Sequence, residues 1–141
     1  MEASVTWEHD LSFIGTAASG DRLPMASASD REGGFSPMEL VLLALAGCTA
    51  MDVIAMLRKQ GERVSGFAVR VRAERAQAHP RVFTRASLEY QLSGEGIHRA
   101  AVERAIELST TKYCSVHAML GSTVAIDHTY QLLEADRLPP A

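Results

Sequence analysis

The hydrophobic positions of the chain fall into one long apolar segment and several shorter alternating ones. Residues 36–60 begin with SPMELVLLALAGCTAMD and are apolar on every side of the helix that their spacing predicts. Ser36, Pro37 and Glu39 fit a capping box, with serine as N-cap, proline at the first helical position and glutamate at the third. Gly61 is expected to end this helix. We therefore predict one long central helix, buried in the core.

Shorter alternating segments predict strands around the helix. Residues 1–35 contain two apolar clusters, SVTWE and LSFIGTA, turn residues within SGDRLPM, and a polar loop, SASDREGG. Residues 65–93 are predicted to form a hairpin about the linker AQAHP, because apolar and charged side chains alternate on both sides of it. The expected inward positions are Phe67, Val69, Val71, Val82, Leu88, Tyr90 and Leu92. The expected outward positions are Arg70, Arg72, Glu74, Arg85, Glu89 and Gln91.

The last third of the chain is predicted to contain two helices and a strand. Residues 97–121 show helical spacing to about Lys112, and Cys114 then opens a second, short helical stretch. Residues 122–134 alternate as a last strand, and the tail RLPPA is expected to be loose. These elements predict a single α+β domain over 1–141, with curved antiparallel sheets packed on the apolar helix. The expected inward positions of the first helix are Ile97, Ala101, Ala105 and Leu108.

Composition narrows the class of protein. The 141 residues suit a domain with a real core, and a net charge of −3 gives no basic surface for nucleic acid. The N-terminus does not resemble a signal peptide, and the longest apolar run, Leu40–Cys48, is shorter than the roughly 20 residues that cross a bilayer. Two cysteines are too few for a disulfide scaffold. We therefore expect a cytoplasmic protein with reduced thiols and no membrane partner.

Cys48 has two interpretations. At helical spacing its neighbours are Ala44, Leu45, Met51 and Asp52, and a largely apolar environment is typical of an inert core thiol. However, one short domain rarely covers a helix that is apolar all round. Part of that surface could then lie in a subunit interface, where the thiol would border a pocket.

Cys114 is predicted between two helices, where unpaired N–H groups and the helix dipole stabilise a thiolate. His117, three residues later, is either a cationic partner or a structural histidine. With two cysteines and histidines that show no ligand spacing, we predict no structural zinc site. Cys48 and Cys114 are 66 positions apart, and only the fold can bring them together.

Two segments carry a resemblance to a known family. SPMELVLLALAGCTAMDV, together with ELSTTKYCSVHAML, resembles the OsmC/Ohr family of osmotically inducible and organic-hydroperoxide-resistance proteins, and most of all its YhfA-like branch. The likeness extends over nearly the whole chain in the same order. It implies an OsmC-like fold and an intertwined homodimer, in which two central helices pack together and strands of both subunits wrap them.

The resemblance also implies a thiol chemistry. In the peroxidase members a thiolate on this helix attacks an organic hydroperoxide, and the sulfenic acid condenses with a second cysteine. An external dithiol then reduces the disulfide, so no resident cofactor is expected. By position, Cys48 matches the peroxidatic cysteine and Cys114 the resolving one.

The chain departs from the peroxidase pattern at two places. Those members carry an acidic residue directly after the helix-start proline, whereas this chain has Met38 there and Glu39 one place later. Glu39 is either a helper acid at the catalytic site or only part of the capping box. The early strand lacks the usual arginine, and its nearest substitutes, Arg22 and Arg31, are typical of solvated loop charges. A slow thiol peroxidase is therefore expected; the alternative is a non-catalytic binder of an apolar small molecule, or a redox sensor, using the same interface pocket.

Overall fold

The computed structural model describes residues 1–27 and 33–134. By its internal contacts the chain forms two compact units, Met1–Val41 and Leu42–Ala141. Most of the predicted polar loop, including Arg31, lies outside the described residues, and so does the tail RLPPA. The single domain over the whole chain stays a prediction.

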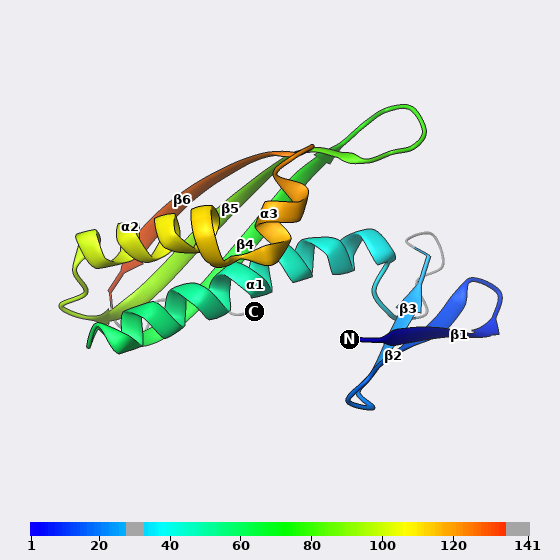
Figure 1. Cartoon of the computed structure of the whole chain (residues 1–141), viewed down its shortest axis with the longest axis horizontal. Coiled ribbons are helices and arrows are strands. Elements are labelled where there is room, and N and C mark those ends of the chain that lie inside the picture. Colours follow the sequence, from blue (N-terminus) through cyan, green and yellow to red (C-terminus); the bar gives the residue numbers. More distant parts are fainter. Residues whose placement is uncertain (28–32, 135–141) are drawn as a thin grey trace. The chain divides into compact units, whose positions relative to one another are not determined.

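The first unit contains a three-stranded antiparallel sheet in the order β1 (Ala3–His9), β2 (Ser12–Ala17) and β3 (Arg22–Ala26), as Figure 1 shows. The first two strands were predicted, but β3 lies where the sequence indicated only a turn. Gly20, with φ of 92°, supplies that turn just before β3. Pro24 is tolerated within β3 because this strand is at the edge of the sheet.

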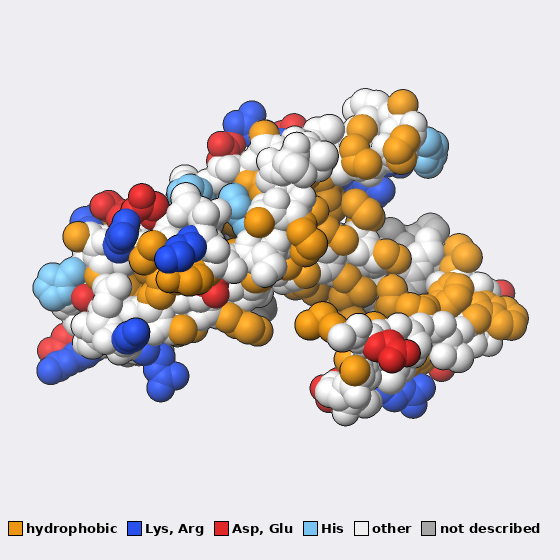
Figure 2. All heavy atoms as spheres, in the orientation of Figure 1, with side chains coloured by type: hydrophobic (Ala, Val, Ile, Leu, Met, Phe, Trp, Pro, Cys, Tyr) orange, Lys and Arg blue, Asp and Glu red, His pale blue; other side chains and the backbone are white. Residues whose placement is uncertain are grey.

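One face of this sheet is apolar and poorly covered. The strand register places Val5, Trp7, Phe13, Leu23 and Met25 on the same side. Val5 is 59% exposed and Trp7 is 63% exposed. Hydrophobic side chains are visible at the surface over this sheet and along the central helix in Figure 2. A sheet of this kind does not bury its own apolar face.

The central helix, α1 (Pro37–Lys59), begins and ends as the sequence predicts. The Ser36 backbone N–H donates to Glu39 Oε2 at 2.8 Å, and the Glu39 N–H donates to Ser36 Oγ at 3.3 Å, which completes the capping box. After the helix, Gly61 has φ of 81°, and the N–H groups of Gly61 and Glu62 donate to carbonyls of the last turn. This is a Schellman ending, which favours glycine.

Only one side of α1 is fully buried by its own chain. The opposite side exposes apolar residues, with Leu43 at 49% and Met51 at 73%. By length and composition alone, α1 could also span a membrane, contrary to the estimate from the shorter run Leu40–Cys48. It is instead a core helix, because its buried side chains pack within the second unit. These side chains recur at every fourth position: Leu45, Thr49, Val53 and Leu57.

The second unit contains the sheet β4–β5–β6, made of β4 (Arg63–Arg75), β5 (Phe83–Glu95) and β6 (Ala125–Leu133). β4 and β5 form the predicted antiparallel hairpin, but β5 and β6 are parallel, which corrects the prediction of antiparallel sheets throughout. Parallel neighbours need a long crossover, and residues 96–124 supply it. The α2 and α3 helices of this crossover and the α1 helix lie on the same face of the sheet (Figure 1).

Burial along β5 confirms most of the predicted pattern and corrects two positions. Val82 was expected to point inward, but it precedes the strand and is 52% exposed, while Phe83 is buried in its place. Gln91 was expected to point outward into solvent, but it is buried, because β5 is the central strand and its side chains are flanked on both sides. The inward positions are confirmed for Leu88, Tyr90 and Leu92.

The crossover consists of α2 (Arg99–Leu108), a π-helical turn η1 (Ser109–Tyr113) and α3 (Ser115–Leu120). Of the four inward positions predicted for this helix, only Ala105 is fully buried. The others are half-buried, because the helix is rotated by about one position from the expected face. The residues that are buried are Val102, Ala105, Ile106 and Ser109.

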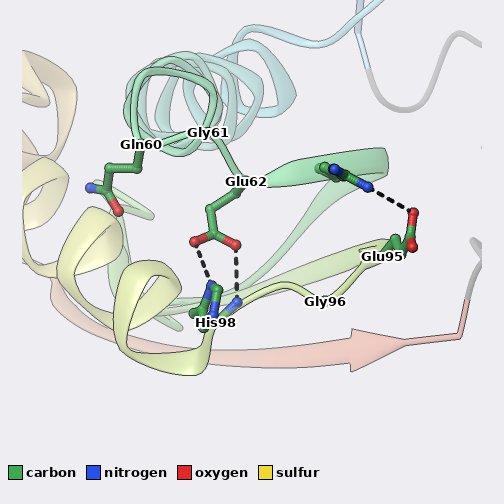
Figure 3. Close-up of a pocket in the computed structure, with 7 residues that line it drawn as sticks. Gln60, Gly61, Glu62, Glu95, Gly96 and His98 are labelled. Carbon is green, nitrogen blue, oxygen red and sulfur yellow. Dashed lines mark hydrogen bonds and ion pairs between the residues drawn. The ribbon is translucent and has the colours of Figure 1, made fainter.

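Glu62 joins the end of α1 to the start of α2. Its carboxylate accepts hydrogen bonds from the backbone N–H and from Nδ1 of His98, both at 3.0 Å, as Figure 3 shows. These bonds, led by the one from the backbone, lower the pKa of Glu62. The neighbouring surface pocket of about 310 Å³ is lined by residues 60–63, 95, 96 and 98, and so contains neither cysteine.

Candidate functional site

The fold brings the two cysteines together. Cys48 lies half-buried on α1, and Cys114 lies buried between η1 and α3. Both are free thiols. Asp52, one helical turn after Cys48, completes a cluster in which the two sulfurs and a carboxylate oxygen all lie within 4.8 Å of one another. Sequence spacing could not establish this meeting.

The π-helical turn positions Cys114. The Cys114 N–H donates to the Ser109 carbonyl at 2.8 Å, across the wide turn. Its backbone then becomes extended, and its sulfur accepts the His117 N–H at 3.3 Å, so that Cys114 is the N-cap of α3. The sulfur is therefore held by the first turn of α3.

Cys114 is a protonated thiol near neutral pH. Burial, and next the hydrogen bond to Cys48, raise the pKa of Cys114 to about 11; the nearby Asp52 carboxylate acts in the same direction. The His117 N–H lowers this pKa, as the helix-end argument predicted, but burial outweighs it. Burial and then His128 lower the pKa of His117 itself, which disfavours a cationic partner for the thiol.

A buried chain of hydroxyl groups holds Asp52. Thr49 Oγ1 lies 2.7 Å from the Tyr90 hydroxyl and 2.9 Å from Ser109 Oγ, and Ser109 Oγ donates to Asp52 Oδ2 at 2.9 Å. Thr49, Tyr90 and Ser109 are fully buried. The sequence gives one hint of this hydrogen-bonded network, because Thr49 is a polar residue in an apolar helix. No motif indicates Ser109 or Tyr90 as the partners of Thr49.

The other predicted site residues lie in the first unit. Glu39 closes the capping box and also accepts the Ser36 hydroxyl at 2.8 Å; its role as a catalytic helper stays a prediction. Arg22 is exposed at the start of β3. Arg31, the other candidate arginine, lies outside the described residues.

Comparison with known sequences identifies the family. The family model described as OsmC-like protein matches residues 29–129. Protein YhfA of Escherichia coli K12 is 41% identical over 135 residues, which cover 96% of this chain and all of that protein. The chain therefore belongs to the OsmC-like family.

Solved structures show the same fold. A hypothetical protein from Aquifex aeolicus VF5 superposes with a TM-score of 0.86 at 24% identity, over 96% of this chain and 97% of that one. The organic hydroperoxide resistance protein OhrB of Bacillus subtilis superposes with a TM-score of 0.63 at 12% identity, over 93% and 98% of the two chains. The OsmC-like fold expected from the sequence is confirmed.

Proposed function

We propose that this protein reduces organic hydroperoxides with the Cys48–Cys114 pair, as a cytoplasmic defence against oxidative stress. The observation that carries the proposal is that two free thiols from distant parts of the chain have their sulfurs within 4.8 Å of one another. Membership of the OsmC-like family supports it, as does a fold shared with a protein named for organic hydroperoxide resistance.

The environments of the two sulfurs suggest their roles. Cys48 is the more exposed cysteine and is the nucleophile, whereas the buried Cys114 keeps its proton. The Cys48 thiolate attacks the terminal peroxide oxygen. The O–O bond breaks, and the alkoxide takes up a proton and leaves as the alcohol, so Cys48 becomes a sulfenic acid.

Cys114 then resolves the sulfenic acid. Its sulfur attacks Cys48 and forms the disulfide, and the displaced hydroxide leaves as water with the proton of the Cys114 thiol. Asp52 is the nearby base for this proton, since its oxygen lies within 4.8 Å of both sulfurs. An external dithiol reduces the disulfide by two exchange steps and restores both thiols.

The sequence around the thiols predicts a slow first step. The peroxidase members have an arginine that favours thiolate formation, and the early strand of this chain lacks it. We therefore expect turnover well below that of an arginine-activated peroxidase. The catalytic contribution of Glu39 belongs to this proposal and is tested by the Glu39→Gln variant, which keeps a side-chain acceptor for the capping box.

The protein is further proposed to act as a homodimer. Proteins of this family are commonly dimers. The exposed apolar side of α1 and the apolar face of the N-terminal sheet both suit burial against a second copy.

The first experiment measures intact mass after one equivalent of cumene hydroperoxide, alongside peroxide consumption with dithiothreitol. Loss of two hydrogens with catalytic consumption is expected of the wild type. Cys48→Ser should consume no peroxide. Cys114→Ser should gain one oxygen as a sulfenic acid after one equivalent, and a second oxygen as a sulfinic acid only when a second equivalent is added. Equal consumption by the wild type and both variants would contradict the proposal. Stoichiometric uptake that survives both substitutions would indicate a binding protein instead.

A further inference from the structure

We infer that Cys48, Asp52 and Cys114 together form a binding site for a thiophilic divalent cation of the zinc class. This site does not depend on the proposed peroxide chemistry, although it uses the same sulfurs. The sequence predicted no metal site, because Cys114 is 66 positions from Cys48 and only the fold brings it to Cys48 and Asp52.

The distances between the donor atoms suit such an ion. Two sulfurs and one carboxylate oxygen lie within 4.8 Å of one another, so a cation at their centre would be no more than about 2.8 Å from each. Zinc–sulfur bonds are about 2.3 Å long and zinc–oxygen bonds about 2.0–2.2 Å. Each side chain therefore needs to move inward by roughly half an ångström or slightly more, which a χ1 adjustment supplies.

The charges also suit a cation. Two thiolates and one carboxylate within 4.8 Å of one another would repel one another. A divalent ion reverses this, because two thiolates and one carboxylate then surround a double positive charge. Binding releases two protons, one from each thiol, so the affinity should rise with pH.

The surrounding hydrogen bonds orient the ligands. Ser109 donates to Oδ2 of Asp52 at 2.9 Å and is itself bonded to the buried Thr49, which leaves the other carboxylate oxygen for the metal. The His117 N–H donates to Cys114 Sγ at 3.3 Å and stabilises a thiolate there. Outer hydrogen bonds of this kind fix ligand geometry in metal sites.

Three protein ligands leave one tetrahedral position for water or a small molecule. While both sulfurs are bound to the cation, they cannot form a disulfide. Oxidation of the pair to a disulfide removes two of the three ligands and releases the ion. Binding of the cation should therefore prevent oxidation of the thiol pair by peroxide, and oxidation should prevent binding of the cation.

The test is a titration of the reduced, full-length protein with Co²⁺ and then Zn²⁺, with a phosphine in place of a thiol reductant. We expect a thiolate-to-cobalt charge-transfer band at one equivalent per chain, and its loss when Zn²⁺ displaces the cobalt. Asp52→Asn, which keeps an acceptor for Ser109, should weaken binding by at least about tenfold. Asp127→Asn, an exposed carboxylate bonded to Arg85, is the matched control and should bind like the wild type.

Absence of the charge-transfer band in the wild type, or unchanged affinity in Asp52→Asn, would overturn the site. Wild-type protein oxidised to its disulfide is a second comparison that needs no substitution, and it should not show the band. Peroxide consumption is measured separately on chelator-treated protein. Consumption without the cobalt band would refute the metal site alone, and the band without consumption would refute the peroxidase alone.

Discussion

The hydroxyl of Ser109 donates a hydrogen bond of 2.9 Å to the carboxylate of Asp52, across 57 positions of sequence. The bond connects the π-helical turn of the crossover to the helix that carries Cys48. Because Ser109 also bonds to Thr49, one hydroxyl group links the crossover to two positions of α1. The geometry of the thiol pair depends on this link, since Cys114 follows directly after the same turn.

Removal of the Ser109 hydroxyl should destabilise the protein. Ser109→Ala is expected to lower the free energy of unfolding by about 1–3 kcal/mol, because Thr49 and Asp52 each lose a partner in a buried network. Urea denaturation measures this change. Ser122→Ala removes an exposed hydroxyl and should change stability by less than about 0.5 kcal/mol. A loss in Ser109→Ala no larger than in this control would contradict the role of the network.

The reactivity of Cys114 should report its raised pKa. In the Cys48→Ser variant, alkylation of Cys114 by iodoacetamide is expected to be slow at pH 8 and to rise only above the ordinary thiol range, because burial, the largest cause of the raised pKa of Cys114, is kept. The same chain unfolded in urea should react with a midpoint near the ordinary thiol pKa of about 8.5. A folded midpoint equal to the unfolded one would contradict burial of a protonated thiol.

The same shift predicts how stability depends on pH. The folded state binds the Cys114 proton more tightly than the unfolded state, so this contribution to stability is complete below the unfolded pKa. It is lost as the pH rises from about 9 towards about 11. Cys114→Ser should flatten the decline in urea midpoint over this range, and an identical decline in both proteins would refute the linkage.

Oxidation should stabilise the folded chain. A Cys48–Cys114 disulfide would close a loop of 66 positions, and the loss of unfolded-state entropy corresponds to about 4 kcal/mol. Thermal unfolding of oxidised and reduced protein measures this gain, which dithiothreitol should reverse. Cys114→Ser treated with the same peroxide is the control and should show no gain. A lower melting temperature for the oxidised wild type would mean that the disulfide distorts the site.

The exposed side of α1 should mediate dimer formation. Light scattering is expected to give twice the 15.3 kDa of one chain for the wild type. Met51→Glu should lower this mass, because it would bury a charge in an apolar interface. Val82→Glu, at another exposed apolar position, should remain a dimer. A monomeric wild type, or a Met51→Glu protein that stays dimeric, would remove this explanation for the apolar surface of α1.

Features that depend on nearby residues were predictable from the sequence. The capping box of α1 involves residues three positions apart, and the hairpin of β4 and β5 follows from alternation along adjacent segments. The likeness of two segments to the OsmC/Ohr family added the fold. The position of Cys48 on the long helix and that of Cys114 between two helices followed from the helical spacing.

Features that depend on distant residues were not predictable. β3 is short and contains Pro24, and only pairing with β2 makes it a strand. The parallel pairing of β6 and the π-helical turn are set by how the crossover packs, so the inward face of α2 was misplaced. The partners of Asp52 and Thr49 were missed for the same reason, since hydrogen bonds across more than forty positions leave no local pattern.

The parallel pairing of β5 and β6 also affects when the two thiols come together during folding. Cys48 is synthesised on α1 long before the crossover that carries Cys114, and the crossover is anchored at its far end only when β6 has paired with β5. A chain still emerging from the ribosome therefore carries Cys48 without its partner. During that interval Cys48 has no second thiol with which to form a disulfide, so under the proposed peroxide chemistry the newborn chain is open to overoxidation that the finished protein arrests.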